Sequence, residues 1–261
     1  MRSILVIGIG AGDPDHMTVQ AVKALNRVDV VFLPSKGAEK DGLQKLRRDI
    51  CARFIEGRTE DHGPRFVEMR LPERDIAATP DYKANIGAWR AGVAAQYETF
   101  MTEELAEGQC GAFLVWGDPA IYDGTIRILD DIAAKGTLAF DCEVIPGISS
   151  VSALAARHRV PLNGVGEAIQ ITTGRKLEAG WPADAENLVV MLDGRHAYAA
   201  LPADGVEIFW GAYVGTPDEI LISGPLRETA PKIAEAHKAA RAKHGWIMDS
   251  YILRRIAVKS P

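Results

Sequence analysis

The sequence predicts an α/β protein with two domains: an N-terminal parallel five-stranded sheet with flanking helices, and a C-terminal mixed α/β sheet domain. Three observations predict it. Short apolar runs alternate with helical patterns through the first half of the 261 residues, as expected of a parallel sheet covered by helices. In the second half, apolar runs follow one another with few helices between them. A Pro-Gly turn at 146–147 separates the two patterns.

The first domain is expected to span residues 1–145. Its apolar runs predict strands at 3–8, 28–34, 65–71, 112–117 and 141–146. Helical patterns fit between them at 18–27, 43–55, 82–107 and 124–134. In the second of these helices, Leu43, Leu46, Ile50 and Phe54 recur at helical spacing and share one face.

The second domain is expected to span residues 146–261. It begins with a helix at 149–157, and strands are predicted at 168–173, 188–192, 206–210 and 220–223. A helix at 229–243 and a last strand at 246–253 follow. Because several strands come without intervening helices, a mixed sheet is predicted.

Composition and charge exclude several classes of function. The formal net charge of -5 gives no support for nucleic-acid binding. No apolar run approaches the ~20 residues that cross a bilayer, and no signal-peptide pattern opens the chain, so we expect a cytoplasmic protein. Cys51, Cys110 and Cys142 form no C-x-x-C pair and are expected to be reduced, buried thiols. No H-E-x-x-H or paired-cysteine motif indicates a metal site.

A glycine-rich loop, GIGAGDPDHMT (8–18), follows the first strand. It differs from the G-x-G-x-x-G dinucleotide fingerprint, because Asp13 occupies the sixth position and its carboxylate would repel a pyrophosphate. The second strand ends at Pro34, where a dinucleotide binder needs an acid for the ribose. The loop therefore favours a neutral or cationic ligand that approaches the main chain closely.

Two more loops leave strand ends through Gly and Pro. They are WGDPAIYDGT (116–125) and VIPGISS (144–150). Ligands of open parallel sheets bind beyond the carboxyl ends of the strands. Three such loops at one end of one sheet therefore predict a single pocket, lined largely by main chain.

These loops, with VVMLDG (189–194) and FWGAYVGTPDEILISG (209–224), resemble the signatures of the tetrapyrrole methylases, a two-domain S-adenosylmethionine-dependent family of cobalamin and sirohaem biosynthesis. The resemblance runs essentially end to end. Within the family, RRDICARF, HRVPLN, ITTGR and ARAKHGWIMDSYILRR are similar to the deacetylating subgroup, which methylates precorrin-5 at carbon 1 and releases acetate to give precorrin-6A. The resemblance also implies a homodimer.

The resemblance implies which residues contact S-adenosylmethionine and its product S-adenosylhomocysteine. They are Ala11, Trp116, Gly117, Asp118, Ile121, Ser149, Ser150, Leu192, Trp210, Trp246 and Ile247. A sulfonium cation without a phosphate agrees with the chemistry of the first loop. Ala11, Leu192 and Trp210 differ from the commoner family residues Pro, Met and Ala. Trp210 would either stack on the adenine or fill the wall.

The implied reaction needs a general base if water attacks the acetyl group. Asp13 on the first glycine-rich loop and Tyr122 on the loop at 116–125 are the candidate bases. A turn or helix-capping role is the alternative for Asp13, and a packing role for Tyr122. Methyl transfer itself needs chiefly alignment of the reactants.

A precorrin carries many carboxylates, which arginine and lysine recognise by charge-assisted hydrogen bonds. The candidates for substrate binding are Lys36 just after the second strand, Arg47 (or its neighbour Arg48) in LRRDICARF, Arg175 in ITTGR and Arg195 in LDGR. Solvated surface cations are the alternative for each of them.

Three other functions remain open. A nicotinamide-dependent oxidoreductase is suggested by the first loop, but Asp13 and Pro34 argue against it. A non-catalytic tetrapyrrole carrier would have no need of the methyl-donor loops. A methylase that acts on another position of the precorrin ring is the strongest competitor.

Overall fold

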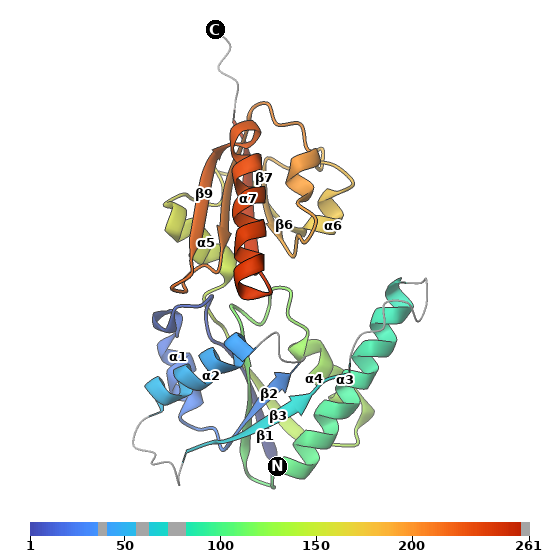
Figure 1. Cartoon of the computed structure of the whole chain (residues 1–261). Coiled ribbons are helices and arrows are strands. Elements are labelled where there is room, and N and C mark those ends of the chain that lie inside the picture. Colours follow the sequence, from blue (N-terminus) through green and yellow to red (C-terminus); the bar gives the residue numbers. More distant parts are fainter. Residues whose placement is uncertain (36–40, 56–62, 73–81, 257–261) are drawn as a thin grey trace. The chain divides into compact units, whose positions relative to one another are not determined.

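The computed structural model describes residues 1–35, 41–55, 63–72 and 82–256. The chain forms two compact units (Figure 1). Unit 1 contains Met1–Gly10 and Pro14–Ile148, and unit 2 contains Ala11–Asp13 and Ser149–Pro261. The chain therefore passes between the units after Ile148, a little later than the 145/146 boundary expected from the sequence. The short segment Ala11–Asp13 belongs to unit 2 although it follows the first strand.

Unit 1 is built on a parallel sheet of five strands in the order β3-β2-β4-β1-β5. The strands are β1 (Arg2–Gly8), β2 (Val30–Ser35), β3 (Arg65–Arg70), β4 (Cys110–Val115) and β5 (Phe140–Ile145). β1 pairs with β4 along one side, Gly8 lying opposite Val115, and with β5 along the other. The carboxyl ends of β1, β4 and β5 therefore lie side by side.

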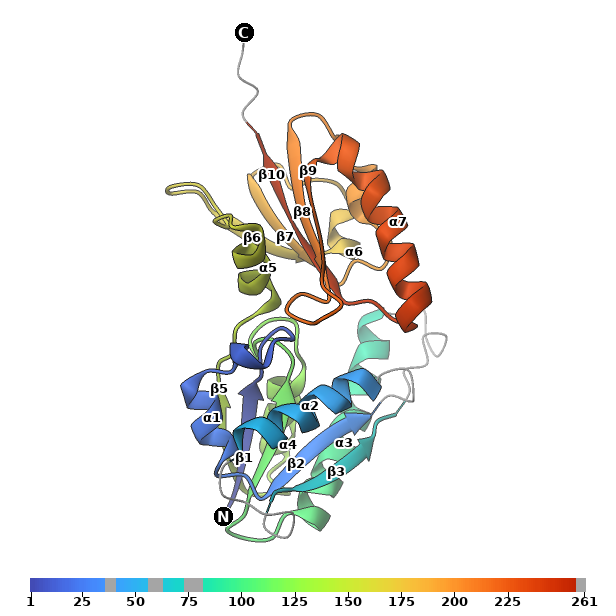
Figure 2. The same cartoon turned by 60° about the vertical axis from the view of Figure 1, so that its left-hand side comes forward.

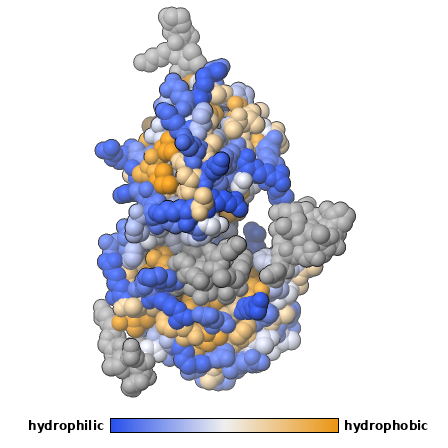
Figure 3. Space-filling model, in the orientation of Figure 1, coloured by the Kyte–Doolittle hydropathy of each residue, from blue (hydrophilic) through white to orange (hydrophobic). Residues whose placement is uncertain are grey.

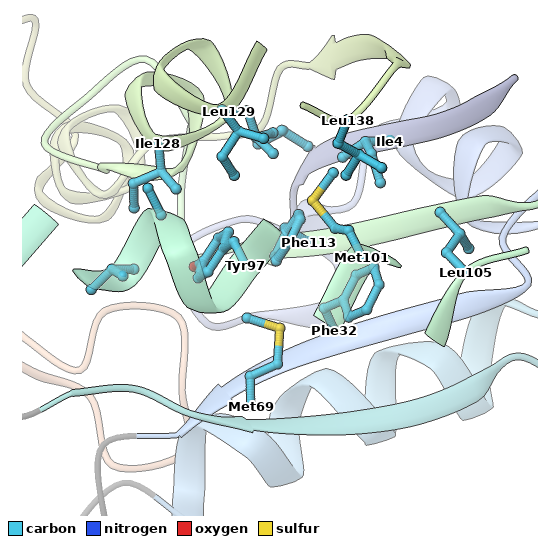
Figure 4. Close-up of a cluster of buried hydrophobic side chains, with 14 of the residues drawn as sticks. Ile4, Phe32, Met69, Tyr97, Met101, Leu105, Phe113, Ile128, Leu129 and Leu138 are labelled. Atoms are coloured by element: carbon cyan, nitrogen blue, oxygen red, sulfur yellow. The ribbon is translucent and has the colours of Figure 1, made fainter. Parts of the chain in front are cut away.

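Helices cover both faces of this sheet. They are α1 (Val19–Leu25), α2 (Asp41–Phe54), α3 (Tyr82–Glu104) and α4 (Thr125–Lys135), with a short 3-10 helix η1 (Pro14–His16) before α1. Residues of α1 and α2 pack on one face and residues of α3 and α4 on the other (Figure 2). On the α3 face, the rings of Tyr97 and Phe113 stack with centroids 4.6 Å apart, and Phe113 also stacks on Phe32 (Figure 4).

Unit 2 is built on a mixed sheet in the order β6-β7-β10-β8-β9, in which only β6 and β7 are parallel neighbours. The strands are β6 (Ile169–Thr173), β7 (Asn187–Met191), β8 (Val206–Ala212), β9 (Ile220–Pro225) and β10 (Asp249–Arg255). α5 (Ser150–His158) packs on one face. α6 (Gly174–Leu177), a 3-10 helix η3 (Ala197–Ala200) and α7 (Leu226–His244) pack on the other.

The predicted fold class is confirmed, and the expected strands and long helices are present with ends that differ by a few residues. The short helix α6 and the 3-10 helices were not predicted. The last strand begins at Asp249 instead of 246, because Trp246–Met248 form a linker after the α7 cap Gly245. The expectation for the thiols is wrong in part: all three are free, but only Cys51 is buried, and Cys142 is exposed.

Polar and apolar side chains share the surface of both units on the side drawn in Figure 3. Across the described ranges, none of the helices has the combination of length and apolarity that crossing a bilayer requires. In the same ranges, no group of three His, Cys, Asp or Glu side chains is arranged to hold a metal ion.

Candidate functional site

Two loops of unit 1 are joined by main-chain hydrogen bonds directly beyond the sheet. Gly10 and Gly117 form an antiparallel bridge. The amide of Gly117 donates to the Gly10 carbonyl at 2.8 Å, and the amide of Gly10 donates to the Gly117 carbonyl at 3.3 Å. Both glycines have positive φ, +82° and +70°, a conformation that glycine adopts readily. The loops after β1 and β4 are thus fixed to each other through the main chain.

The third loop joins them by close backbone contact. A Cβ on Gly147 would lie 2.2 Å from the Gly117 carbonyl oxygen, and one on Gly8 would lie 2.6 Å from the Gly147 nitrogen. Neither position can accept a side chain, because every blocking atom belongs to the backbone. The predicted convergence of three strand ends is therefore real within unit 1, and glycine makes it possible.

Asp118 connects two of these loops through its carboxylate. Its Oδ1 accepts from the Ala120 amide at 2.8 Å, and its Oδ2 accepts from the Gly147 amide at 2.9 Å. These are amides that an anionic ligand would need, and a carboxylate already occupies them. The edge therefore repels a phosphate and suits a neutral or cationic group.

The other predicted residues on the β4 loop are partly or largely accessible. Trp116 and Ile121 are partly exposed, and Tyr122 is 48% exposed with a positive φ of 52°. Partial burial raises the pKa of the Tyr122 hydroxyl. A bulky residue in the left-handed region is strained, and such strain is concentrated at functional sites.

Arg47 lies where β2 separates from β4. β2 pairs with β4 only through Val30–Phe32, while Leu33–Ser35 pair with β3 alone. The Arg47 Nε donates to the Leu114 carbonyl at 2.9 Å. Burial lowers the pKa of this guanidinium, while Tyr97 and Asp123 act in the opposite direction. A cation is therefore held at the carboxyl end of β4.

The first loop contributes residues 11–13 to unit 2. Ala11 is 2% exposed and packs with Leu154, Val189 and Ile252. Gly12 has a φ of +140°, and a Cβ there would lie 2.8 Å from the Val214 carbonyl oxygen. Asp13 is partly exposed. The Arg157 guanidinium forms a bidentate ion pair with Glu219, which raises the pKa of Arg157, and the charge of Asp13 acts in the same direction.

Ser149 begins unit 2 as the N-cap of α5. Its Oγ accepts from the Ser152 amide at 3.1 Å, and the residue is 7% exposed. Ser150, the first residue of α5, is partly exposed. The local reason for the helix start is therefore an ordinary hydroxyl cap.

The loop after β7 presents Leu192, which is 66% exposed and has a φ of +56°. The next residue, Asp193, is 4% exposed and holds this loop. Its carboxylate accepts from the Arg195 amide (3.1 Å), the Ala197 amide (2.7 Å) and the Tyr251 hydroxyl (2.6 Å). A Cβ on Gly174 would lie 2.3 Å from Asp193 Oδ1, so glycine is required in the neighbouring ITTGR loop. A buried carboxylate thus fixes a strained, exposed apolar side chain.

Trp210 is fully buried, and its Nε1 donates to Asp249 Oδ2 at 2.8 Å. Asp249 itself is partly exposed. Trp246 and Ile247, also partly exposed, lie in the linker before β10, where the Tyr213 hydroxyl donates to the Trp246 carbonyl. The Trp210 ring belongs to the core of unit 2 and connects to the end of the sheet through Asp249.

The predicted substrate-binding cations lie in different surroundings. Arg175 is exposed at the start of α6, and the Arg195 side chain is 81% exposed, 3.4 Å from Glu178. Lys36 lies outside the described residues. In unit 2, the loops that carry Arg175 and Arg195 follow the parallel neighbours β6 and β7 and are fixed to each other by Asp193 and Gly174.

Sequence reasoning missed Asp193 and Asp249. Each is a lone acid, and the glycines, arginines and aromatic residues around it were the more obvious candidates. The available signal was an acid directly beside a strand of otherwise apolar or aromatic residues, in VVMLDG and WIMDSYIL. Burial of a carboxylate is rare without a partner, so such acids are expected to be hydrogen-bonded.

Comparison with known proteins gives the family. Residues 3–230 match the family described as Tetrapyrrole (Corrin/Porphyrin) Methylases. A precorrin-6A synthase [deacetylating] from Sinorhizobium sp. is 50% identical over 255 residues, covering 98% of this chain and 96% of that protein. A precorrin-2 C(20)-methyltransferase from the same source is 28% identical over 74% of each chain.

Comparison with solved structures agrees with this family. A protein related to cobalamin synthesis from Corynebacterium diphtheriae is 35% identical, with a TM-score of 0.81, over 98% of this chain and 99% of that one. Uroporphyrin-III C-methyltransferase from Thermus thermophilus, solved in complex with S-adenosylhomocysteine, has a TM-score of 0.56 at 16% identity over 97% of each chain, and shows the shared fold. The family predicted from the three loops is confirmed, and this chain belongs to the tetrapyrrole (corrin/porphyrin) methylases.

Proposed function

We propose that the chain is an S-adenosylmethionine-dependent C-methyltransferase that methylates precorrin-5 at carbon 1 and releases acetate to give precorrin-6A. One observation carries the proposal: the 50% identical relative, matched over nearly its whole length, is a deacetylating precorrin-6A synthase. The relative named for C(20) methylation is matched at 28% over a shorter part of the chain. Methylation at carbon 1 is therefore the better supported position.

The main-chain edge of unit 1 fits the methyl donor. Gly8, Gly10 and Gly147 have no room for a side chain because neighbouring residues pack directly against them, so main-chain atoms form much of this edge. Asp118 places a negative charge there and occupies two amides. A dinucleotide with its pyrophosphate would meet that carboxylate, which argues against the nicotinamide-dependent alternative.

We assign donor binding to the residues that the family resemblance indicates. S-adenosylmethionine supplies, when bound, the methyl group of its sulfonium. In unit 1 the assigned residues are Trp116, Gly117, Asp118 and Ile121, and in unit 2 they are Ala11, Ser149, Ser150, Leu192, Trp210, Trp246 and Ile247. Exposed Leu192 and partly exposed Trp116 offer apolar contact, while buried Ala11 and Trp210 support the shape behind them.

Arg47, Arg175 and Arg195, together with Lys36, are proposed to orient the carboxylates of the tetrapyrrole. The side chains of Arg175 and Arg195 are exposed to solvent, where a large anionic substrate can reach them. Asp13 and Tyr122 remain proposed catalytic residues on the first two loops. A homodimer and a cytoplasmic location also remain proposals.

The function is tested by incubating the protein with precorrin-5 and S-adenosylmethionine. Acetate should appear in an amount equal to the methyl group transferred, and each should require the other reactant. Methyl transfer without acetate would assign the chain to another ring position. No transfer at all, with S-adenosylhomocysteine still bound, would favour the carrier alternative.

The substrate assignment is tested with the double variant R175Q/R195Q. We expect precorrin binding to weaken about 100-fold or more, since two charge-assisted hydrogen bonds of roughly 1.5–3 kcal/mol each are lost, while the Kd of S-adenosylhomocysteine stays unchanged. Arg227→Gln is the matched control, because Arg227, in the first turn of α7, has an exposed side chain that pairs with Asp204. Equal loss of both ligands in the double variant would contradict the assignment.

A further inference from the structure

The proposed reaction requires a group that accepts a proton from water, and the inference below rests on that function. Water must lose a proton as its oxygen attacks the acetyl carbon. The sequence pointed to Asp13 and Tyr122 for this role. The structure offers a carboxylate that the sequence did not single out, at the end of the unit 2 sheet near which four of the predicted donor-binding residues lie: Leu192, Trp210, Trp246 and Ile247.

Three chain segments of unit 2 meet at this end of the sheet. β7 ends there and leads into Leu192, β8 ends there at Ala212 and leads into Tyr213, and β10 begins there at Asp249. In the register, Asp249 pairs with Ala212, and Ser250 pairs with Met191. Asp249 is therefore the first residue of the strand that lies between the other two.

The two neighbours of Asp249 in the sheet are followed by strained residues. Leu192 has a φ of +56° and Tyr213 a φ of +50°. Left-handed conformations at bulky residues cost roughly 1–3 kcal/mol and persist only where the surroundings enforce them. Here the surroundings do enforce them: Asp193 fixes the Leu192 loop, and the Tyr213 amide donates to the Met248 carbonyl at 2.9 Å.

Asp249 is itself held in one orientation. The indole Nε1 of Trp210 donates to its Oδ2 at 2.8 Å, and the indole cannot move because Trp210 is fully buried. The Tyr213 hydroxyl fixes the linker before Asp249 through the Trp246 carbonyl. The residue as a whole is nevertheless partly exposed. It combines a fixed geometry with access from outside the core, whereas both oxygens of Asp118 accept main-chain amides and Asp193 is almost fully buried.

We infer that Asp249 is the general base of the deacetylation. Its carboxylate takes one proton from water while the water oxygen forms a bond to the acetyl carbonyl carbon. The bond between that carbon and carbon 1 of the macrocycle then breaks, acetic acid leaves, and the electron pair stays on the conjugated ring. Carbon 1 uses this pair to form its new bond to the methyl group, while the bond between that methyl group and the donor sulfur breaks, its electron pair stays on sulfur and S-adenosylhomocysteine leaves. Asp249 and acetic acid each release a proton to solvent.

The surroundings adjust the basicity of this carboxylate. Burial raises the pKa of Asp249, the hydrogen bond from Trp210 lowers it and the negative charge of Asp193 raises it, so that the pKa is about 6. The other titratable groups that face it are the hydroxyls of Tyr198, Tyr213 and Tyr251. A base works best when its pKa lies near the working pH, and an ordinary aspartate near 3.8 would be a weaker one.

The direct test is the variant Asp249→Asn, assayed with precorrin-5 and S-adenosylmethionine from pH 5 to pH 8. In the unsubstituted protein, the rate of acetate release should rise with pH through an apparent pKa near 6, because the base acts in its ionised form. In D249N, acetate release should fall by roughly 100-fold or more, and the rise with pH should disappear. The Kd of S-adenosylhomocysteine should change little.

The matched control is Asp204→Asn, an exposed aspartate of the same unit that pairs with Arg227. It should keep the rate and the pH profile of the unsubstituted protein. A D249N protein that keeps the rise near pH 6, or that loses acetate release and S-adenosylhomocysteine binding in parallel, overturns the inference. If the unsubstituted protein releases no acetate, it is the proposed function that fails.

A second variant covers the case in which D249N does not fold. Trp210→Phe removes the hydrogen bond that stabilises the ionised carboxylate. The pKa of Asp249 should then increase, and the rise in acetate release should move to higher pH. A profile that stays in place, or moves to lower pH, overturns the inference, because a merely structural effect of the substitution would lower the rate without that upward shift.

Discussion

Unit 1 and unit 2 shape the ends of their sheets in different ways. In unit 1 the loops after β1, β4 and β5 meet through backbone atoms, and Gly8 and Gly147 leave no room for a Cβ. In unit 2 the corresponding end is organised by side chains, chiefly Asp193 and Asp249 with their partners Tyr251 and Trp210. The edge of unit 1 is therefore sensitive to added side-chain atoms, and the edge of unit 2 is sensitive to the removal of a single polar atom.

The difference follows from the two sheet types. Parallel strands with their crossovers bring several loops to one edge, and close packing of those loops requires small residues. In the mixed sheet of unit 2, strands begin and end at the same edge. There the buried carboxylate of Asp193 holds its own loop by accepting two main-chain amides, and it connects that loop to β10 by accepting from the Tyr251 hydroxyl. Such buried polar groups are costly unless fully hydrogen-bonded.

The largest effect is expected from adding one methyl group to the edge of unit 1. In Gly147→Ala the new Cβ would lie 2.2 Å from the Gly117 oxygen and 2.8 Å from the carbonyl carbon of Gly8, so backbone must move. We expect the free energy of unfolding of unit 1 to fall by about 3 kcal/mol or more, measured by chemical denaturation. Binding of S-adenosylhomocysteine should be lost as well.

The matched control for Gly147→Ala is Gly87→Ala in α3, where a Cβ would meet nothing within 4 Å. There the substitution should raise the free energy of unfolding by roughly 0.5–1 kcal/mol, since alanine favours helix. Equal effects at the two positions would show that the backbone contact at the edge of unit 1 is not what requires glycine.

Much of the fold and part of the site followed from the sequence for identifiable reasons. The parallel sheet was predicted because its strands are near-continuous apolar runs such as ILVIG, and buried strands need no alternation. The meeting of three loops was predicted because strands of one parallel sheet end at one edge. Gly10 and Gly117 were recognisable, since few residues other than glycine adopt positive φ.

The rest depends on contacts distant in sequence. No residue near Asp193 in the sequence indicates that the Tyr251 hydroxyl, 58 positions later, donates a hydrogen bond to its carboxylate. The same holds for Trp210 and Asp249, 39 positions apart. The sequence suggested that Trp210 stacks on a ligand or fills a wall, and only the structure shows its indole N–H directed at a carboxylate. Local patterns predict elements, whereas partners across a sheet depend on register.

The second prediction concerns the dependence of unfolding on pH, which should arise at the unit 2 edge. The pKa of Asp249 is about 6 in the folded chain against 3.8 ordinarily, so the folded state binds the proton more tightly. That contribution to stability is present below about pH 4 and is lost as the pH rises through about 6. Relative to Asp249→Asn, which does not titrate, the unsubstituted protein should lose up to about 3 kcal/mol between pH 4 and pH 7.

The measurement is the difference in the free energy of unfolding between the two proteins at several pH values. Groups common to both cancel in that difference. A difference that is constant with pH, or that changes in the opposite direction, would show that burial does not raise the proton affinity of Asp249.

The third prediction removes a single oxygen from unit 2. Tyr251→Phe deletes the hydroxyl that donates to Asp193 at 2.6 Å and leaves a buried carboxylate with one bond fewer. The free energy of unfolding should fall by about 2 kcal/mol, and affinity for S-adenosylhomocysteine should weaken because the Leu192 loop loses a constraint. Chemical denaturation and calorimetric titration measure the two effects.

Tyr198→Phe is a close control, because its ring lies edge-to-face with that of Tyr251 at 5.2 Å. Its buried hydroxyl has no hydrogen-bond partner within the described ranges. Removing it should cost little or increase stability slightly. If both tyrosine variants lose the same free energy of unfolding, the loss comes from the ring environment and not from the Asp193 hydrogen bond. The edge of unit 2 would then not depend on that hydrogen bond.

The smallest effect is expected where the two units use the same local device. Ser149 caps α5 in unit 2, and Thr18 caps α1 in unit 1 by accepting from the Ala21 amide at 3.0 Å. Ser149→Ala and Thr18→Ala should each lower the free energy of unfolding by about 1 kcal/mol, the usual value of a hydroxyl cap. Because Ser149 is also an assigned donor-binding residue, only its variant should weaken S-adenosylhomocysteine binding. Loss of that affinity in Thr18→Ala as well would mean that ligand binding follows helix stability in general, and the assignment of Ser149 would lose its support.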